Sequence, residues 1–599
     1  MDDYKSDEDE DLKLAIAMSL QDQGNPAASA PDHDATLATT GDDPSSNKAH
    51  SSFSNEESKV QLTDDESRSI PVITVPSISH VSTGQQITSI LGLDRRRMEE
   101  ERLARLAQRK RTLDDGSTNQ ADEATKRQKL GTSSISKSVL TETAGDASAT
   151  SKLHQASSPK ALKYSKGAIL KTASPKHPRN RDITIAEVLQ KDDLLLAVIS
   201  SFMWDFDWLI SKLDMRRTKL VMCMAAKTEE QRRQYSDEAK EAGRGRIRCC
   251  FPPMEGETQN MHSKLMLLAY EHSMRIVVPS ANAVPYDWGE TGIMENTVFV
   301  IDLPRLNNAE EPQNQNSLTS FGKELLYFLD KSKMPDFVKE GMLKFDFAAT
   351  EHLAFVHSVG GANFGSDMQR TGFNSLARSI RELGLASQTD LHLDVAASSI
   401  GALTDSMLNS LHNAAKGKTT LDNTRTKSQL GNTKVRDFFS VYFPTLDTVK
   451  ESIGGIESGG TICIREEWFT KPTFPSDVMR DYKSTRKGLL SHNKILLAHN
   501  KTVAWVYVGS ANLSESAWGK VVNDSKRKEN KLVCRNWECG VLIPVAGGVL
   551  GDDETSAQSL ERDVDIRKLF DSVIDIPFDI PSNEYGTKKP WYFLAPHWN

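Results

Sequence analysis

Aromatic residues are nearly absent from the first 180 residues of this 599-residue chain. Of its 9 Trp, 11 Tyr and 21 Phe residues, only Tyr4, Phe53 and Tyr164 fall there. A segment this poor in aromatics cannot bury enough apolar surface to offset the entropy lost on ordering. We therefore predict a disordered arm over 1–180. The remaining residues, about 420, suffice for one large or two medium domains.

Long apolar runs, a leader-like start and a cysteine framework are also missing. No run reaches the roughly 18 apolar residues that a membrane span needs. The acidic start, MDDYKSDEDEDL, is unlike a signal or transit peptide. The 6 Cys include the adjacent Cys249 and Cys250 and show no paired zinc-ligand spacing. We expect neither a disulfide framework nor a metal cofactor, and a reducing compartment, cytosol or nucleus.

The chain also lacks an excess of positive charge, since its formal net charge is −8 at pH 7. Nucleic-acid binding therefore cannot be inferred from net charge, and any such surface must be local.

Within the arm, residues 7–22 have a helical pattern. An acidic block, which suits the N-terminus of a helix, precedes Leu12, Ala15, Ile16 and Ser19 on one face. This order of acids, large apolar residue, Ala and Ser resembles the ubiquitin-interacting motif. The resemblance implies that ubiquitin or a ubiquitylated protein binds these four residues. The alternative is a solvated acidic tail with a nascent helix.

A second segment of the arm, 94–129, is rich in basic clusters. The clusters Arg95–Arg97, Arg109–Arg111 and Lys126–Lys129 are typical of nuclear localisation signals, so we expect a nuclear protein. The alternatives are a solvated charged helix face and a nonspecific nucleic-acid tether.

An internal repeat contains the candidate chemistry. Residues 261–284 align without a gap with residues 491–514. A lone His-x-Lys arises by chance, as at His499, but two that share a Ser-Ala-Asn tripeptide at the same offset do not. The aligned polar residues are His262 with His492, Lys264 with Lys494, and Asn282 with Asn512.

The pattern of each repeat predicts a strand, a turn and a second strand. His and Lys are two residues apart, so on a strand both side chains face the same way. An apolar run, a polar turn and a second apolar run then lead to the Ser-Ala-Asn loop, which can return Asn beside that face.

Two His, two Lys and two Asn suit phosphodiester cleavage. The Lys charges and Asn amides can hold phosphate oxygens and the added charge of the transition state. One imidazole can attack phosphorus, and the other can protonate the leaving group and then activate water. The route has two steps through a phosphohistidine and needs no metal. The residues alone do not show which His attacks.

His-x-Lys with a downstream Asn, present twice, resembles the phospholipase D superfamily. That superfamily usually has Asp seven residues after the His, where this chain has Ala269 and His499. Absence of both Asp resembles one branch, the type 1 tyrosyl-DNA phosphodiesterases, over roughly 185–595. Further matching segments are Trp204–Leu209, Ser398–Gly401, Phe443–Thr445, Ala517–Gly519, Glu538 and Tyr585-Gly586.

The resemblance implies a DNA-repair enzyme that hydrolyses the bond between a DNA 3′ phosphate and the tyrosine of trapped topoisomerase I, and processes other blocked 3′ ends. His262 would be the nucleophile, and His492 the general acid and then base, oriented by Glu538. The phosphate would be held by Lys264, Lys494, Asn282 and Asn512. Hydroxyl and amide donors along the DNA backbone would be Ser399, Ile400, Gly401, Ala402 and Ser514.

Two features depart from the branch pattern. A Gln that mirrors Glu538 is missing, and Thr291 is its expected counterpart. The aromatic residue usually found shortly before the first His is also missing, with Thr258 in its place. Base stacking near the scissile end is therefore weaker or comes from elsewhere.

We predict an α/β fold of two similar lobes, 181–372 and 373–599. Each is a mixed β-sheet sandwiched by helices, and a pseudo-twofold relates them around one shared active site. We expect a monomer without a cofactor or membrane association. The alternatives are another phosphodiesterase or nuclease of the superfamily, a phospholipase, and a ubiquitin-reading scaffold at DNA lesions with a decayed site.

Overall fold

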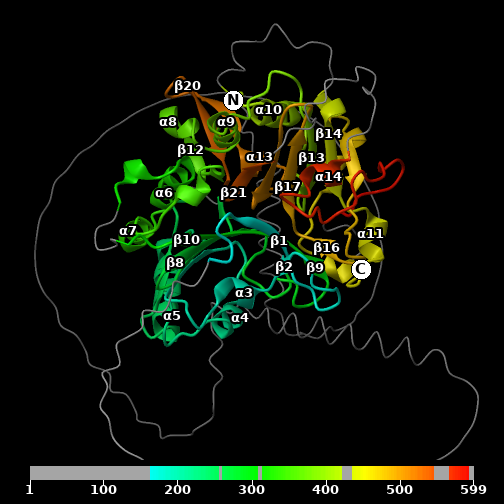
Figure 1. Ribbon diagram of the computed structural model, residues 1–599. Coiled ribbons are helices and arrows are strands. Elements are labelled where there is room, and N and C mark those ends of the chain that lie inside the picture. The colour runs from blue at the N-terminus through cyan, green and yellow to red at the C-terminus, as the bar shows by residue number, and fades with distance from the viewer. Residues whose placement is uncertain (1–161, 255–258, 308–312, 421–434, 546–564, 593–599) are drawn as a thin grey trace, which may run out of the picture. The chain divides into compact units, whose positions relative to one another are not determined.

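The computed structural model (Figure 1) describes residues 162–254, 259–307, 313–420, 435–545 and 565–592. The predictions for 7–22 and 94–129 lie outside these ranges. None of the described helices is long and apolar enough to cross a membrane.

The first lobe is built on an eight-stranded mixed sheet, ordered β2-β1-β10-β8-β7-β3-β4-β5. Its strands are β1 (Ala168–Thr172), β2 (Asp182–Ile183), β3 (Leu196–Ser200), β4 (Lys219–Cys223), β5 (Ile247–Cys250), β7 (Leu265–Ala269), β8 (Ser273–Pro279) and β10 (Thr297–Pro304).

The second lobe is built on a sheet whose main path is β11-β21-β18-β17-β13-β14-β15. These strands are β11 (Ala354–Ser358), β13 (His392–Ala397), β14 (Phe439–Phe443), β15 (Met479–Asp481), β17 (Lys494–His499), β18 (Ala504–Gly509) and β21 (Asn536–Pro544). Smaller pairings involve β6 (Asn260–Met261), β9 (Met294–Glu295), β12 (Gly361–Asn363), β16 (Leu490–Ser491), β19 (Lys520–Asp524) and β20 (Glu529–Cys534).

The two sheets follow the same plan. Across the first sheet in spatial order, from β1 to β5, four antiparallel pairings are followed by two parallel ones. Across the second sheet, from β11 to β15, the pairings have the same order. The hairpin β7–β8 thus corresponds to β17–β18, so the sequence repeat is also a structural repeat. The predicted α/β class with mixed sheets and helices is confirmed.

Alternating side chains place each sheet between two cores. On β3, Val198 faces an inner core shared by both sheets, whereas Ala197 and Ile199 face outward. On β17, Ile495 belongs to the same inner core and Leu496 to the outer core of the second lobe. Because both faces of these strands are covered, their sequences are continuous apolar runs without polar alternation.

Helices cover the outer faces, with α3, α4 and α5 on the first sheet and α9 and α10 on the second (Figure 1). Capping boxes begin α3 at Thr184 and α5 at Thr228. The α-helices are α3 (Ile185–Leu189), α4 (Phe206–Ser211), α5 (Glu229–Ala242), α6 (Ser320–Lys331), α7 (Asp336–Met342), α8 (Gly365–Met368), α9 (Phe373–Glu382), α10 (Asp405–Ala415), α11 (Leu446–Lys450), α12 (Glu466–Phe469), α13 (Glu515–Trp518) and α14 (Ile566–Phe570).

The lobe boundaries differ from the predicted ones. Strand β1 begins at Ala168 and pairs with β10, so the first lobe starts before 181. Strand β11 pairs with β21 of the second sheet, although it precedes 373. The aromatic content of the sequence did not reveal β1, because Tyr164 is the one aromatic residue close to this strand in sequence. Its partly buried ring lies beneath the Arg275 guanidinium.

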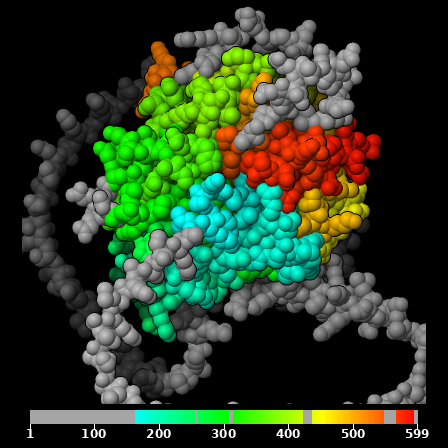
Figure 2. Space-filling view, viewed as in Figure 1, coloured from blue at the N-terminus to red at the C-terminus, as the bar shows by residue number. Residues whose placement is uncertain are grey.

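The C-terminal segment binds the first lobe. Lys171 Nζ on β1 lies 2.5 Å from Asp575 Oδ2, and Arg181 donates to the Asp571 carbonyl. Figure 2 shows the two segments as adjoining cyan and red surfaces. The Phe578 ring of the same segment packs 4.7 Å from the Tyr442 ring on β14, so residues 565–592 contribute to holding the lobes together.

Candidate active site

The two histidines are each held by a strand of the opposite lobe. Strand β6, just before His262, pairs with β21, and the His262 N–H donates to the Trp537 carbonyl at 3.1 Å. Strand β16, just before His492, pairs with β9, and the His492 N–H donates to the Glu295 carbonyl at 3.1 Å. The exchange brings both repeats to the junction of the lobes.

The two lysines are fully buried in equivalent ways. Lys264 Nζ donates to the His262 carbonyl at 2.7 Å, and Lys494 Nζ donates to the His492 carbonyl at 2.6 Å. Lys494 also donates to Ser398 Oγ at 2.8 Å. Burial lowers the pKa of Lys264 to about 8. Burial and the nearby Lys264 charge lower the pKa of Lys494 well below its usual value. Among the described residues, no carboxylate is hydrogen-bonded to either lysine, so the pair favours an anionic ligand.

Glu538 binds His262, so the prediction that it orients His492 is wrong. Its Oε2 lies 2.9 Å from His262 Nδ1, and its Oε1 accepts from Asn536 Nδ2 at 2.9 Å. Burial acts to raise the pKa of Glu538, but His262 and Lys264 hold it below the usual value. An ionised carboxylate requires the proton on Nδ1, which leaves the His262 Nε2 lone pair free to attack.

Asp287 is the carboxylate that faces His492, the histidine that Glu538 was expected to orient. Asp287 Oδ2 lies 3.4 Å from His492 Nδ1 and accepts from the backbone N–H and Nδ2 of Asn282 at 2.7 and 2.8 Å. Thr291 Oγ1 is buried without a hydrogen-bond partner in the described structure. Burial acts to raise the pKa of Asp287, but His492 and the Asn282 N–H hold it below its usual value.

The position equivalent to Glu538 in the first lobe is Asn296. Ser510 Oγ donates to Glu538, and Ser280 Oγ donates to Asn296 Oδ1 at 2.7 Å. Asn296 cannot carry charge, so in the first lobe the carboxylate comes from the loop after Asn282. Sequence reasoning missed Asp287 because the second repeat has no corresponding acid.

Burial favours the neutral form of both histidines in the free site. Burial lowers the pKa of His262, and Glu538 acts in the opposite direction. Burial lowers the pKa of His492 to about 4, and the Lys494 charge adds to the shift. A neutral nucleophile and a base that can take up a proton are thus both present.

The side-chain amides of the two asparagines have different hydrogen-bond partners. Asn282 Oδ1 accepts from the Met203 N–H at 3.2 Å, and its amide nitrogen is held by Asp287. Asn512 Oδ1 accepts from the Ser399 N–H at 3.2 Å, whereas its Nδ2 donates to no described residue. Asn512 is therefore the amide more available to a bound oxygen.

An aromatic ring lies beside the first histidine. The Phe202 ring is 5.3 Å from the His262 ring and 5.8 Å from Lys264 Nζ. Thr258, where an aromatic was missing, lies outside the described residues. Phe202 thus supplies an aromatic surface to the site, and no sequence motif pointed to it.

The residues expected along the DNA lie together at the second-lobe rim. Bridge Ile400–Leu513 links the segment from Ser399 to the loop ending in Ser514. The N–H groups of Ser399, Ile400 and Gly401 donate to Asn512 Oδ1, the Cys463 carbonyl and the Leu513 carbonyl. These amides therefore cannot donate to phosphate as expected, which leaves the Ser399 and Ser514 hydroxyls and the Ala402 N–H.

Across the described residues, no group of three or more His, Cys, Asp or Glu side chains is placed to hold a metal ion.

The chain resembles known proteins in sequence and in fold. The chain is 25% identical over 379 residues to tyrosyl-DNA phosphodiesterase 1 of Arabidopsis thaliana, spanning 60% of this chain and 58% of that protein. It is 24% identical over 438 residues to tyrosyl-DNA phosphodiesterase 1 of Drosophila melanogaster, spanning 69% and 70%. A crystal structure of a mutant yeast tyrosyl-DNA phosphodiesterase shares the fold, with a TM-score of 0.52 and 18% identity. The superposition covers 72% of this chain and 100% of that chain.

Two family models match the chain. The ubiquitin interaction motif matches residues 7–23, in agreement with the predicted motif. Tyrosyl-DNA phosphodiesterase matches residues 168–586, which include both sheets and both His–Lys–Asn sets. With that match across the two lobes that build the site, the chain belongs to the tyrosyl-DNA phosphodiesterase family.

Proposed function

We propose that this protein hydrolyses the phosphodiester between a DNA 3′ end and a tyrosine of trapped topoisomerase I, and processes other blocked 3′ ends in DNA repair. The observation that carries the proposal is the junction of the lobes. There, two neutral histidines, each facing a carboxylate from the other lobe, flank two buried lysines.

In the first step, His262 Nε2 attacks phosphorus while Glu538 holds the Nδ1 proton. The bound phosphate anion and Asp287 favour the imidazolium form of His492, which takes up a proton from solvent as the substrate binds. The P–O bond to tyrosine breaks, the tyrosine oxygen takes this proton, and His492 becomes neutral. The product is DNA joined to His262 through a phosphohistidine. Lys264 and Lys494 stabilise the added negative charge in a site with little water.

In the second step, His492 takes a proton from water, which attacks phosphorus and displaces His262 Nε2. DNA with a 3′ phosphate leaves, and both histidines return to their starting state. Asp287 stabilises the His492 imidazolium, which begins the first step and re-forms in the second. The side chains supply the nucleophile, the acid and the charge, so we propose that no metal is required.

A 5′-labelled DNA strand ending in 3′-phosphotyrosine, incubated with the full chain and excess EDTA, tests the proposal on a denaturing gel. We expect a 3′-phosphate strand from the wild-type protein and none from His262→Ala. Intact substrate with folded wild-type protein would contradict it. Hydrolysis of phospholipid in preference to this DNA would favour the superfamily alternative.

We also propose that the arm binds ubiquitin and directs the protein, as a monomer, to the nucleus. The motif match at 7–23 supports the first part. Ser19→Asp should weaken capture of the full chain by immobilised ubiquitin, and Ser29→Asp, outside the motif, should not.

Gln substitution of the basic residues in 94–129 should move a fluorescent fusion to the cytoplasm. Light scattering of the purified chain should give about 66.5 kDa.

A further inference from the structure

A β-hairpin rises from the rim of the candidate site. It consists of β19 and β20, which form a three-stranded sheet with β12. Its first strand follows α13, whose N-cap is Ser514. Its second strand leads into β21, where Asn536 donates to Glu538. Both ends of the hairpin are therefore fixed beside residues of the site.

The turn of this hairpin is strongly basic in an acidic chain. Lys526, Arg527 and Lys528 are consecutive and exposed. Neither lysine has a carboxylate partner among the described residues, and Arg527 Nη1 is 3.8 Å from Glu529. The Arg527 guanidinium lies 4.1 Å over the Phe364 ring, which limits its motion without using its donors.

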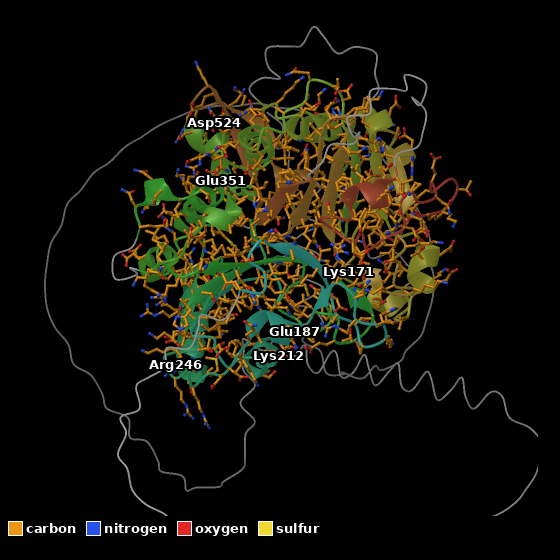
Figure 3. All side chains as sticks on the ribbon, in the orientation of Figure 1. Lys171, Glu187, Lys212, Arg246, Glu351 and Asp524 are labelled. Atoms are coloured by element: carbon orange, nitrogen blue, oxygen red, sulfur yellow. The ribbon has the colours of Figure 1, made fainter. Side chains whose placement is uncertain are left out.

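Asp524, one of the two acids that flank the turn, is engaged within the hairpin. Asp524 Oδ1 accepts from the N–H groups of Lys526 and Arg527 at 3.0 and 2.9 Å, and its Oδ2 is 2.9 Å from Lys531 Nζ. The hydrogen bond from Lys531 is the main reason that the pKa of Asp524 is lowered to about 2. In Figure 3 Asp524 lies at the margin of the second lobe, where nitrogen-tipped side chains extend outward.

We propose that this basic turn binds the backbone phosphates of the DNA strand whose 3′ end occupies the active site. The inference rests on the proposed function and extends it to the path of the DNA. Five strand residues at roughly 3.3 Å each span about 16 Å. At about 3.4 Å per nucleotide, the turn reaches phosphates four to six nucleotides from the 3′ end. Arginine and lysine side chains on the turn of a hairpin can bind backbone phosphates without recognising the base sequence.

Binding of uncleavable DNA tests the proposal without using catalysis. Fluorescence anisotropy would compare a 5′-labelled dinucleotide and a 12-mer, both with a 3′ phosphate, on the wild-type chain and on K526Q/R527Q/K528Q. We expect about tenfold weaker binding of the 12-mer and no change for the dinucleotide. The slope of log affinity against log salt for the 12-mer should fall by about 2, because three phosphate contacts are lost.

A matched control removes the same charge elsewhere. Arg216, Arg217 and Arg246 are exposed, and Arg246 lies at the opposite end of the molecule from Asp524 (Figure 3). R216Q/R217Q/R246Q should bind both oligonucleotides as the wild type does. K526R/K528R, which keeps the charge, should retain 12-mer binding and shows that the turn tolerates substitution.

Three outcomes would overturn the inference. They are unchanged 12-mer binding by the triple-Gln variant, an equal loss for both lengths, and a loss seen only when a peptide is attached to the DNA. Failure of the wild type to cleave 3′-phosphotyrosyl DNA would remove the proposed function instead. Length-dependent binding would still be measurable in that case, so the two failures are distinguishable.

Discussion

Replacing Asp287 with Asn tests whether this carboxylate acts on His492. Asp287 and His492 Nδ1 are 3.4 Å apart and both are buried. Full charges at this distance interact by about 5 kcal/mol at an effective dielectric of 20. Not all of this energy is lost in the variant, because Asp287 also accepts two hydrogen bonds from Asn282, and the Asn side-chain oxygen can still accept them. We expect a loss of about 3 kcal/mol of transition-state stabilisation, roughly 10²-fold in rate.

The loss should fall mainly on the second step. A tyrosine leaving group, with a pKa of about 10, needs less proton donation than water, with a pKa of about 16, needs general-base help. Without Asp287, His492 is a weaker base. DNA attached to His262 should therefore accumulate in Asp287→Asn.

Rapid-quench kinetics with 5′-labelled 3′-phosphotyrosyl DNA would separate the steps, because the attached strand migrates with the protein on a denaturing gel. Thr291→Val is the matched control from the same loop and should turn over as the wild type does. The reasoning is refuted if Asp287→Asn turns over within twofold of the wild type, or if it slows without accumulating the adduct while Thr291→Val accumulates it.

The remaining predictions concern charge and pH. Because burial lowers the pKa of Lys264 to about 8 and that of Lys494 well below its usual value, kcat/KM should fall as pH rises through 8, and the double variant Lys264→Arg with Lys494→Arg should remove this limb from a pH–rate profile. Arg486→Met leaves the buried Glu295 with the Ser484 hydroxyl but without its cationic partner, and should lower the free energy of unfolding in urea by about 3–5 kcal/mol. Lys171→Met breaks a pair whose acid is partly exposed and should cost under about 1 kcal/mol. Since the folded-state pKa of His492 is about 4, the unfolded state binds more protons below about 6.5, so stability should decline from pH 6.5 to 4, and His492→Asn should flatten that decline.

The sequence predicted the six repeated side chains because they recur as short linear patterns. A repeat of His, Lys and Asn at one spacing predicts equivalent strands and loops, and β7–β8 and β17–β18 have that relation. Such a pattern is local, so no tertiary contact has to be known before it can be recognised.

The partners of the histidines could not be predicted in the same way. The pairing of Glu538 with His492 was taken from the family resemblance. In the fold, β21 carries Glu538 to β6 of the other lobe, where it meets His262. Register between distant strands depends on the packing of whole sheets, and no residue near either histidine encodes it.

The difference between the two carboxylates supports separate roles for the histidines. Glu538 contacts His262 at 2.9 Å and has two further donors on its oxygens, so it fixes one tautomer, as a nucleophile requires. Asp287 stands off from His492 at 3.4 Å, which leaves the imidazole room to gain and lose a proton during the cycle. The two sheets are arranged alike, but Asn296 at the first-lobe counterpart of Glu538 breaks the symmetry. The assignment of His262 as nucleophile, first taken from a family resemblance, therefore has independent support in the electrostatics of this site.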